Sequence, residues 1–261
     1  MGYDMTTLSA GRAIHSDENL SSIAKAARVL RSLAEAGGSD VGVTSVALHA
    51  GLPKSTTHRV LAELMAEGLV GRNGQRYCLG HAWFELQSAL SSSEWVRLVE
   101  QARQPLARLF ERTNATIHFG VLDEEEVLYL EKLTARGGTV VPTRVGGTMP
   151  AVRTALGKCL LAYSSVDVIR SVMSKPLPQV SRGSIVLPRV LLQQFADIRR
   201  TGLSYDVHES QPGVLCVAAP VAVDDRVVAA VSITRVYARA LAPTDARDVL
   251  RTAQEISEWL A

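Results

Sequence analysis

The stretch that most constrains this chain is residues 51–69, GLPKSTTHRVLAELMAEGL, which has the pattern of an amphipathic helix. At about 100° per residue, its apolar positions fall on one side of a helix and its polar positions on the other. The apolar side comprises Thr57, Val60, Leu61, Leu64 and Met65. Pro53 suits the first helical position, where a backbone N–H has no partner anyway, and Gly68 suits the left-handed residue that ends many helices.

The polar side of this helix is divided by charge. Its first turn and a half carries hydroxyl and basic side chains: Lys54, Ser55, Thr56, His58 and Arg59. Its end carries Glu63 and Glu67, which DNA phosphates would repel. The N-terminal half is therefore expected to enter a major groove, as recognition helices do. The alternative is an ordinary amphipathic surface helix. The sequence on either side of this stretch distinguishes the two possibilities.

Two helices are predicted on the N-terminal side of this one. Ser21 or Ser22 is expected to cap a helix that runs to about residue 36, with Ile23, Ala27, Leu30 and Leu33 or Ala34 on its buried side. Thr44 is expected to cap a short second helix, which Gly51 ends. Two helices joined by about three residues that include glycine are typical of a helix-turn-helix.

A basic hairpin is predicted directly after the recognition helix. Two short apolar runs flank Asn73-Gly74, and this dipeptide is the strongest short signal for a hairpin turn. Arg72 and Arg76 lie near the predicted tip, where they would contact phosphate or the minor groove without reading bases. Residues 21–80 are therefore predicted to form a winged helix-turn-helix, and this context favours DNA binding over an ordinary surface helix.

Length and charge are compatible with two domains, one of which binds DNA. The chain has 261 residues, enough for two cores, and a formal net charge of +2. Within residues 21–80, seven Lys and Arg stand against four Asp and Glu, a modest excess for a DNA-binding domain. Residues 1–20 show no periodicity and are expected to form a flexible arm.

The composition points to a cytoplasmic protein. Cys78, Cys159 and Cys216 occur singly in apolar contexts, which is typical of buried thiols in a reducing compartment. The first residues lack the apolar run of a secretory signal. No stretch approaches the roughly 18 uncharged apolar residues of a membrane span, so no membrane partner is expected.

The remainder of the chain has the pattern of an α+β domain, after a short helical linker predicted at residues 81–93. Helices are predicted at residues 94–113, 150–162, 166–173, 188–201 and 244–260. Strands are predicted where the period changes to two, at residues 116–122, 127–133, 139–144, 215–223 and 227–234. Helices around an antiparallel sheet place residues 94–261 in the α+β class.

The pair Gly157-Lys158 superficially resembles a phosphate-binding loop. Val152 stands where that motif requires glycine, and Cys159 where it requires serine or threonine, so the motif is excluded. What remains is a helix N-terminus whose free N–H groups would face a cavity, and such an end favours an anionic group.

The motifs of both domains together resemble those of the IclR family of bacterial transcriptional regulators. The matching stretches are GLPKSTTHRVLAELMAEGLV, RYCLG, EVLYLEKL, VGGTMP, TALGKCLLA, residues 203–206 with Glu209, and GVLCVAAPV. The resemblance implies a ligand-responsive regulator in which a winged helix-turn-helix is joined to a GAF/PAS-like effector-binding domain. It also implies a homodimer or homotetramer, palindromic double-stranded operator DNA, and a small organic acid as effector.

The resemblance assigns residues to two sites. The family's DNA-contacting positions fall on Lys54, Ser55, Thr56, Thr57, His58 and Arg59. Its effector pocket falls on Gly146, Ala155, Leu156, Asp206, Cys216, Ser232 and Thr234. The chemistry fits, since a helix N-terminus suits a carboxylate and hydroxyls on alternate strand residues face the same way. Two alternatives stay open: Cys216 as core filling, and Asp206 as a turn or capping residue.

Three departures from the family's pattern leave the effector's identity open. The chain has Thr148 where the family usually has arginine, and Ala151-Val152 where it has a bulky residue and histidine. It has Thr234-Arg235-Val236 where Ser-Gly-Pro is common. A pocket that loses one arginine and gains another is expected to hold a different acid, or to hold it from another side. The sequence also leaves open whether the protein represses or activates.

Two other functions compete with ligand-gated DNA binding. A hydrolase fused to a docking module would use Cys216 with Asp206 and His208, or a metal held by His118 and His208. Neither paired-ligand spacing nor a Gly-x-Ser-x-Gly motif supports it, so no catalytic residue, metal or cofactor is expected. The other competitor is a winged helix that docks on protein, which predicts binding with little dependence on salt.

Overall fold

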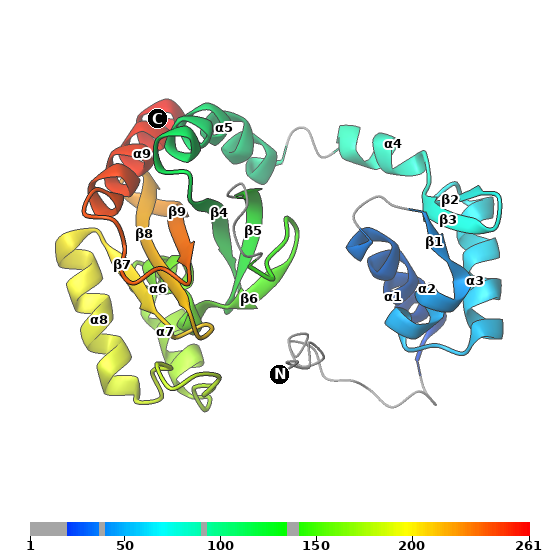
Figure 1. The fold of residues 1–261 in the computed structure, drawn as a ribbon, viewed down its shortest axis with the longest axis horizontal. Coiled ribbons are helices and arrows are strands. Elements are labelled where there is room, and N and C mark those ends of the chain that lie inside the picture. Colours follow the sequence, from blue (N-terminus) through cyan, green and yellow to red (C-terminus); the bar gives the residue numbers. More distant parts are fainter. Residues whose placement is uncertain (1–19, 37–39, 90–92, 135–140) are drawn as a thin grey trace. The chain divides into compact units, whose positions relative to one another are not determined.

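The computed structural model describes residues 20–36, 40–89, 93–134 and 141–261. These residues form two compact units that separate between residues 93 and 94 (Figure 1). The arm predicted at residues 1–20 lies outside the described residues except for Leu20, and so do residues 139 and 140 of one predicted strand. No helix within the four described ranges is long and apolar enough to cross a membrane.

The N-terminal unit packs three helices against a three-stranded antiparallel sheet. The helices are α1 (Ser22–Glu35), α2 (Val43–Ala50) and α3 (Lys54–Ala66). The strands β1 (Val41–Gly42), β2 (Val70–Asn73) and β3 (Arg76–Leu79) lie in the order β1-β3-β2. Val29, Leu61 and Tyr77 belong to the single apolar cluster that joins helices and sheet. The prediction of a winged helix-turn-helix is confirmed.

The recognition helix α3 begins one residue later than predicted and ends as predicted. Pro53 is its N-cap, and the Pro53 carbonyl accepts the Thr57 N–H at 2.9 Å. At the other end, the Leu69 N–H donates to the Leu64 carbonyl, in the hydrogen-bond pattern of a Schellman motif. Gly68 has a φ of +69°, which a glycine adopts without steric cost.

Local details of the first two helices differ from the predictions. Ser21 caps α1 and Leu33 is buried, both as expected, but Ile23 is 82% exposed, because the buried side is centred on Val29 and Leu33. Thr44 does not cap α2, which begins at Val43. The strand β1 was not predicted, because two residues are too short to show a period.

The wing turns one residue later than the sequence signal indicated. Asn73 pairs with Arg76 across the hairpin, so the two loop residues are Gly74 and Gln75. Helix α4 (Ala82–Ala89) follows, and the Trp83 indole donates to the Leu69 carbonyl at 2.8 Å. The residues predicted as a linker therefore include one helical segment held to the wing.

The C-terminal unit is a six-stranded antiparallel sheet with helices on both faces, as the α+β prediction required. The strands are β4 (Thr116–Asp123), β5 (Glu126–Leu133), β6 (Thr148–Pro150), β7 (Ser204–Val207), β8 (Val214–Val223) and β9 (Arg226–Val236). Their order is β6-β5-β4-β9-β8-β7. Helices α5 (Glu94–Thr113) and α9 (Asp245–Leu260) cover one face, and α6 (Ala155–Ala162), α7 (Val166–Met173) and α8 (Pro188–Thr201) lie on the other (Figure 1).

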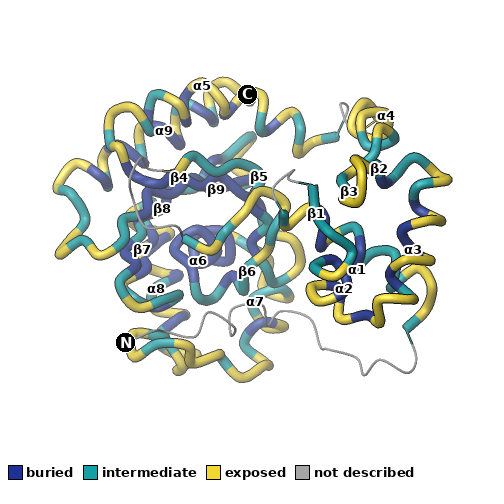
Figure 2. The backbone as a smooth tube through the Cα atoms, turned by 45° about the vertical axis from the view of Figure 1, so that its right-hand side comes forward, coloured by how far each residue is buried: buried dark blue, intermediate teal, exposed yellow. Residues whose placement is uncertain are grey.

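Side-chain alternation along the strands separates the two cores. Val217 and Val231 point toward α5 and α9, whereas their neighbours Ala218 and Ala230 point toward α6. In Figure 2 the strands β4, β8 and β9 and the helix α6 are coloured mostly as buried. The face toward α6 is the one that carries polar side chains, and it therefore positions the candidate site.

Three features of this unit differ from the predictions. Residues 141–144 are not a strand, and the third strand of this region is β6 at Thr148–Pro150. The helix predicted from Pro150 begins only at Ala155, after a 3-10 turn at Ala151–Arg153. Strand β7 was not predicted, because four residues at a sheet edge give little periodic signal.

Candidate functional site

The structure presents the basic half of α3 to solvent. Lys54, Ser55, His58 and Arg59 are exposed and Thr56 is partly exposed, while Glu63 lies exposed toward the other end (Figure 2). These are the residues that the sequence assigned to DNA contact. Their arrangement fits a recognition helix that enters a groove with its N-terminal turns first.

Thr57 does not belong to this surface, and its assignment to DNA contact is wrong. Its side chain is 0% exposed, and its hydroxyl donates to the Pro53 carbonyl at 3.0 Å. The 100° step of the helix places Thr57 beside Val60, Leu61 and Leu64 on the buried side. Helical periodicity already indicated this position, whereas the list of family contacts did not.

The two wing arginines are exposed but held by contacts within the wing. Arg72 donates from Nε to the Gly74 carbonyl at 2.8 Å, and its guanidinium lies 5.7 Å from the centre of the Tyr77 ring. Arg76 donates from Nε to the Asp40 carbonyl at 2.8 Å. These contacts order the side chains near the hairpin turn, and both residues are exposed to solvent.

A pocket opens in the C-terminal unit between the sheet and the N-terminus of α6. Its empty space is about 440 Å³, including the part open to solvent. It is lined by His118, Tyr129, Val141, Pro142, Thr143, Met149, Thr154, Ala155, Leu156, Asp206, Ser210, Gln211, Val214, Cys216, Ser232 and Thr234. Pockets of this size, mostly apolar with a few convergent polar groups, are typical of small-molecule sites.

Six of the seven residues assigned to the effector pocket line this space: Ala155, Leu156, Asp206, Cys216, Ser232 and Thr234. Gly146 does not, which corrects its assignment. Its N–H donates to the Tyr129 carbonyl at 2.8 Å, so it holds the loop beside Tyr129 while the Tyr129 side chain lines the pocket. A glycine in a loop that borders a pocket cannot be distinguished by sequence from one that lines it.

A row of polar side chains crosses the floor of the pocket. Asp206 on β7 is in register with Cys216 on β8, and Cys216 with Thr234 on β9. The Cys216 Sγ and Thr234 Oγ1 atoms are 3.0 Å apart. The register explains how residues far apart in sequence come together on one face of the sheet.

His118 on β4 extends this row. Its Nδ1 atom lies 3.2 Å from Thr234 Oγ1, and its Nε2 atom lies 2.8 Å from Thr143 Oγ1. Burial, with a smaller contribution from the charge of Lys132, lowers the pKa of His118 to about 3. The imidazole is therefore neutral near pH 7 and acts as a hydrogen-bonding group rather than a cation.

The sequence did not assign His118 or Tyr129 to the pocket. The Tyr129 ring is tilted against the imidazole with 5.2 Å between ring centres, and burial raises the pKa of its hydroxyl. The only available signal was the period of two: His118 and Tyr129 sit on the faces of β4 and β5 opposite to Phe119 and Leu128. Which face turns toward a cavity depends on the packing of α6, and no local pattern reveals it.

The N-terminus of α6 supplies hydrogen-bond donors to the pocket. Thr154 caps the helix, and its hydroxyl accepts the Gly157 N–H at 2.9 Å. Within the described residues, the buried N–H groups of Ala155 and Leu156 have no acceptor. Free N–H groups at a helix N-terminus attract anions.

Gly157 allows α6 to begin at this position. A Cβ atom there would lie 2.3 Å from the Ala151 carbonyl oxygen, which is far below any normal contact. The backbone of the preceding 3-10 turn therefore packs directly on the first turn of the helix. Gly157-Lys158 thus has a structural role here.

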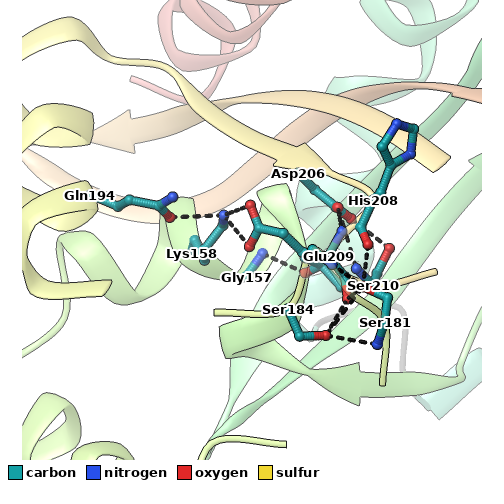
Figure 3. Close-up of polar contacts among 11 residues, drawn as sticks. Gly157, Lys158, Ser181, Ser184, Gln194, Asp206, His208, Glu209 and Ser210 are labelled. Carbon is teal, nitrogen blue, oxygen red and sulfur yellow. Dashed lines mark hydrogen bonds and ion pairs between the residues drawn. The ribbon is translucent and has the colours of Figure 1, made fainter. Parts of the chain in front are cut away.

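Asp206 is buried, and it organises the loop that follows β7. Its carboxylate accepts the Glu209 N–H at 2.7 Å and the Ser210 hydroxyl at 2.5 Å (Figure 3). Burial raises the pKa of Asp206, although these hydrogen bonds partly oppose the shift. The capping role that the sequence left open is therefore present, in a side chain that also lines the pocket.

The expectation that Arg235 replaces a lost pocket arginine is wrong. Arg235 donates to both oxygens of Asp245 on α9, at 2.7 and 2.8 Å. It lies on the face of β9 opposite to Thr234, as strand alternation requires. Arg153 is the arginine beside the pocket: it donates to the Ser210 carbonyl at 3.1 Å, and the charge of Asp206 acts on it.

The residues proposed for catalysis or metal binding do not assemble into such a site. Among the described residues, no group of three His, Cys, Asp or Glu side chains is placed to hold a metal ion. Burial raises the pKa of the Cys216 thiol, so little thiolate is present near neutral pH. Its sulfur forms a hydrogen bond with the Thr234 hydroxyl at 3.0 Å, and the described residues show none between it and a histidine.

Comparison with known proteins agrees with this geometry in both units. The family model for the "IclR helix-turn-helix domain" matches residues 22–74, and that for the "Bacterial transcriptional regulator IclR C-terminal" matches residues 89–258. The chain is 30% identical over 208 residues to the HTH-type transcriptional regulator KdgR of Escherichia coli K12, covering 78% of this chain and 77% of that protein.

Two solved structures share the fold. One is an IclR homolog from Microbacterium hydrocarbonoxydans complexed with 4-hydroxybenzoate, with a TM-score of 0.78, 29% identity and coverage of 92% of this chain and 99% of that chain. The other is the IclR of Thermotoga maritima, with a TM-score of 0.73, 27% identity and coverage of 91% and 98%. The likeness thus extends over both units.

Proposed function

The chain belongs to the IclR family of bacterial transcriptional regulators, and we propose that a small carboxylic acid bound beside α6 controls its binding to DNA. The observation that carries the proposal is that Ala155 and Leu156, the first two residues of α6, line the pocket and that their N–H groups have no acceptor among the described residues. A carboxylate would accept both, favoured by the positive end of the helix dipole. Binding of 4-hydroxybenzoate by a relative of the same fold supports an acid of this size.

The remainder of the pocket suits the carbon skeleton and one further polar group of such an acid. Met149 and Val214 line it with apolar surface, and the Ser232 hydroxyl has no hydrogen-bond partner among the described residues. His118 is neutral and both its ring nitrogens contact threonine hydroxyls, so it supplies no positive charge for a second carboxylate. We infer that the preferred effector carries one negative charge.

The test removes one backbone donor and leaves the helix intact. Ala155→Pro deletes the N–H at the first helical position, where proline is well tolerated. Thr154 has φ −116° and ψ 148°, the extended conformation that a residue before proline requires. Calorimetric titration of the full chain with a panel of small carboxylic acids, including 4-hydroxybenzoate, should show binding by the native protein and about tenfold weaker binding by the variant.

Val166→Pro is the matched control, because it makes the same change at the first position of α7, which does not line the pocket. It should leave acid affinity unchanged. Equal affinity of Ala155→Pro and the native chain for every acid that binds would overturn the assignment of the carboxylate to this helix end.

We also propose how the N-terminal unit binds DNA. Lys54, Ser55, Thr56, His58 and Arg59 would contact bases and phosphates, and Arg72 and Arg76 would contact the backbone or minor groove. A homodimer or homotetramer would place two such units on the half-sites of a palindromic operator. The exposure of Phe84 (78%) on α4, a helix with no buried residue, supports a further copy as its neighbour.

Two expectations about the chain as a whole complete the proposal. We propose that it acts as a cytoplasmic regulator and not as an enzyme. The supporting observation is the bonding of Cys216 to Thr234 in a buried site that disfavours its thiolate. Alkylation of Cys216 at neutral pH should therefore be slow, and rapid modification of this thiol in the folded protein would contradict the assignment.

A further inference from the structure

We propose that Lys158 and Glu209 are positioning residues of the pocket: their buried ion pair fixes the segment 206–211 against helix α6. The segment matters because Asp206, Ser210 and Gln211 line the pocket. Its value for effector binding rests on the function proposed above for that pocket. The positioning itself needs no ligand, because the ion pair is present in the chain alone.

The ion pair is buried on both sides. Lys158 is 0% exposed, and its Nζ atom lies 2.6 Å from each carboxylate oxygen of Glu209 (Figure 3). Nζ also donates to Gln194 Oε1 on α8 at 2.9 Å. The ammonium group therefore has three acceptors, two of which belong to one carboxylate, so the direction of the Glu209 side chain is fixed.

Lys158 connects the two walls that meet at the pocket. It lies in the first turn of α6, the helix that presents the free N–H groups of Ala155 and Leu156. Its partner Glu209 belongs to the loop that begins at Asp206. A displacement of the loop relative to the helix would have to break the ion pair, so the distance between the two walls depends on it.

Further contacts hold the loop near Glu209. Asp206 accepts the Glu209 N–H on the pocket side, and the Ser184 hydroxyl donates to the Glu209 carbonyl at 3.0 Å. The Ser181 hydroxyl bonds to the His208 carbonyl (Figure 3). A Cβ atom on Gly183 would lie 2.8 Å from the Val207 carbonyl oxygen, so this backbone packs closely on the loop. The serine hydrogen bonds thus tie the loop to residues 181–184, and the Lys158–Glu209 ion pair ties it to α6. We call these contacts together the clamp.

Burial of two charges is an inefficient way to stabilise a fold. Desolvation opposes the attraction between the charges, and well-packed apolar residues of similar size often replace such a pair without loss of stability. Burial lowers the pKa of Lys158 and raises that of Glu209, so desolvation favours the neutral form of each group, while their mutual attraction favours the charged forms. An ion pair has a preferred geometry that apolar contacts lack, and the loop it orients lines the pocket.

This difference provides a test that separates positioning from stability. The double variant Lys158→Met with Glu209→Leu removes both charges and keeps the volume. We expect its thermal unfolding temperature to equal or exceed that of the native chain. We also expect hydrogen exchange of the amides in residues 206–211 to accelerate at least about tenfold, because the loop opens more often. Any acid found by titration should also bind more weakly to the double variant than to the native chain.

Unchanged exchange in residues 206–211 of the folded double variant would overturn the proposal, whether or not an acid binds. Glu209→Gln, which keeps the shape and removes the charge, provides the same readout if the double variant does not fold. The exposed pair Asp197–Arg200 on α8 is the control: Asp197→Leu with Arg200→Met should leave exchange in the loop unchanged. Faster exchange in a protein that binds no acid would support the clamp and count against the proposed function.

Discussion

At the scale of single residues, two neighbours on α3 have opposite roles. Thr57 is fully buried and bonds to Pro53, whereas Arg59, two positions later, is exposed at the same end of the helix. The angle between successive residues of a helix decides this, because two steps of about 100° lead to the far side. Residue type alone does not separate the two, since both are polar.

Arg59→Ala should weaken binding to the operator by about 1–3 kcal/mol if the guanidinium contacts a base, and should relax specificity at one base position. The measurement is the affinity for an operator selected from random duplexes, compared with the affinity for random DNA at the same salt concentration. Thr57→Ser is a control whose buried side chain should leave specificity unchanged. Equal losses on operator and random DNA would show that Arg59 contacts phosphate only.

His118 predicts a dependence of stability on pH. Its pKa is about 3 in the folded protein against an ordinary 6.5, so below pH 6.5 the unfolded chain binds a proton that the folded chain does not. Its contribution to stability is therefore complete above pH 6.5 and is lost as pH falls toward 3. His118→Gln removes this titration.

Urea unfolding at a series of pH values measures the effect. The difference in the free energy of unfolding between the native chain and His118→Gln should change with pH, with a slope of up to about 1.4 kcal/mol per pH unit. The buried Asp206 and Glu209, whose pKa values are raised, act in the opposite direction and cancel in this difference. A difference that does not vary below neutral pH would contradict a neutral, buried imidazole.

At the scale of elements, local signals predicted the helices and long strands, and distant contacts decided the rest. Pro53, Gly68 and the alternating runs around Asn73 act within a few residues, so α3 and the wing were predictable to within one position. Strands β1, β6 and β7 have two to four residues, and only their partners across the sheet define them. The start of α6 was misplaced because a 3-10 turn intervenes.

The candidate site shows the same division. Sequence resemblance located Asp206, Cys216 and Thr234, and the strand register explains why they meet. It did not locate His118, which reaches the site only because β4 pairs with β9. Nor could it determine that Arg235 would bond to Asp245 on α9 rather than face the pocket. Such facts depend on which face of the sheet α6 covers.

At the scale of the whole molecule, one thermodynamic link connects acid binding in the C-terminal unit with DNA binding in the N-terminal unit. The acid changes DNA affinity only to the extent that it binds one state of the protein more tightly than the other. By reciprocity, operator DNA must change acid affinity by the same factor. Both halves of this statement can be measured on the same purified chain, without knowledge of the genes that it controls.

The most direct measurement is the affinity of the full chain for its selected operator, with and without a saturating amount of the acid that binds most tightly in the titration. We predict a change in DNA affinity of about 5–150-fold in either direction, and a change in acid affinity by the same factor when operator DNA is added first. The effect should weaken in Ala155→Pro and persist in Val166→Pro. An acid that occupies the pocket and leaves operator affinity unchanged would contradict the claim that this pocket controls DNA binding.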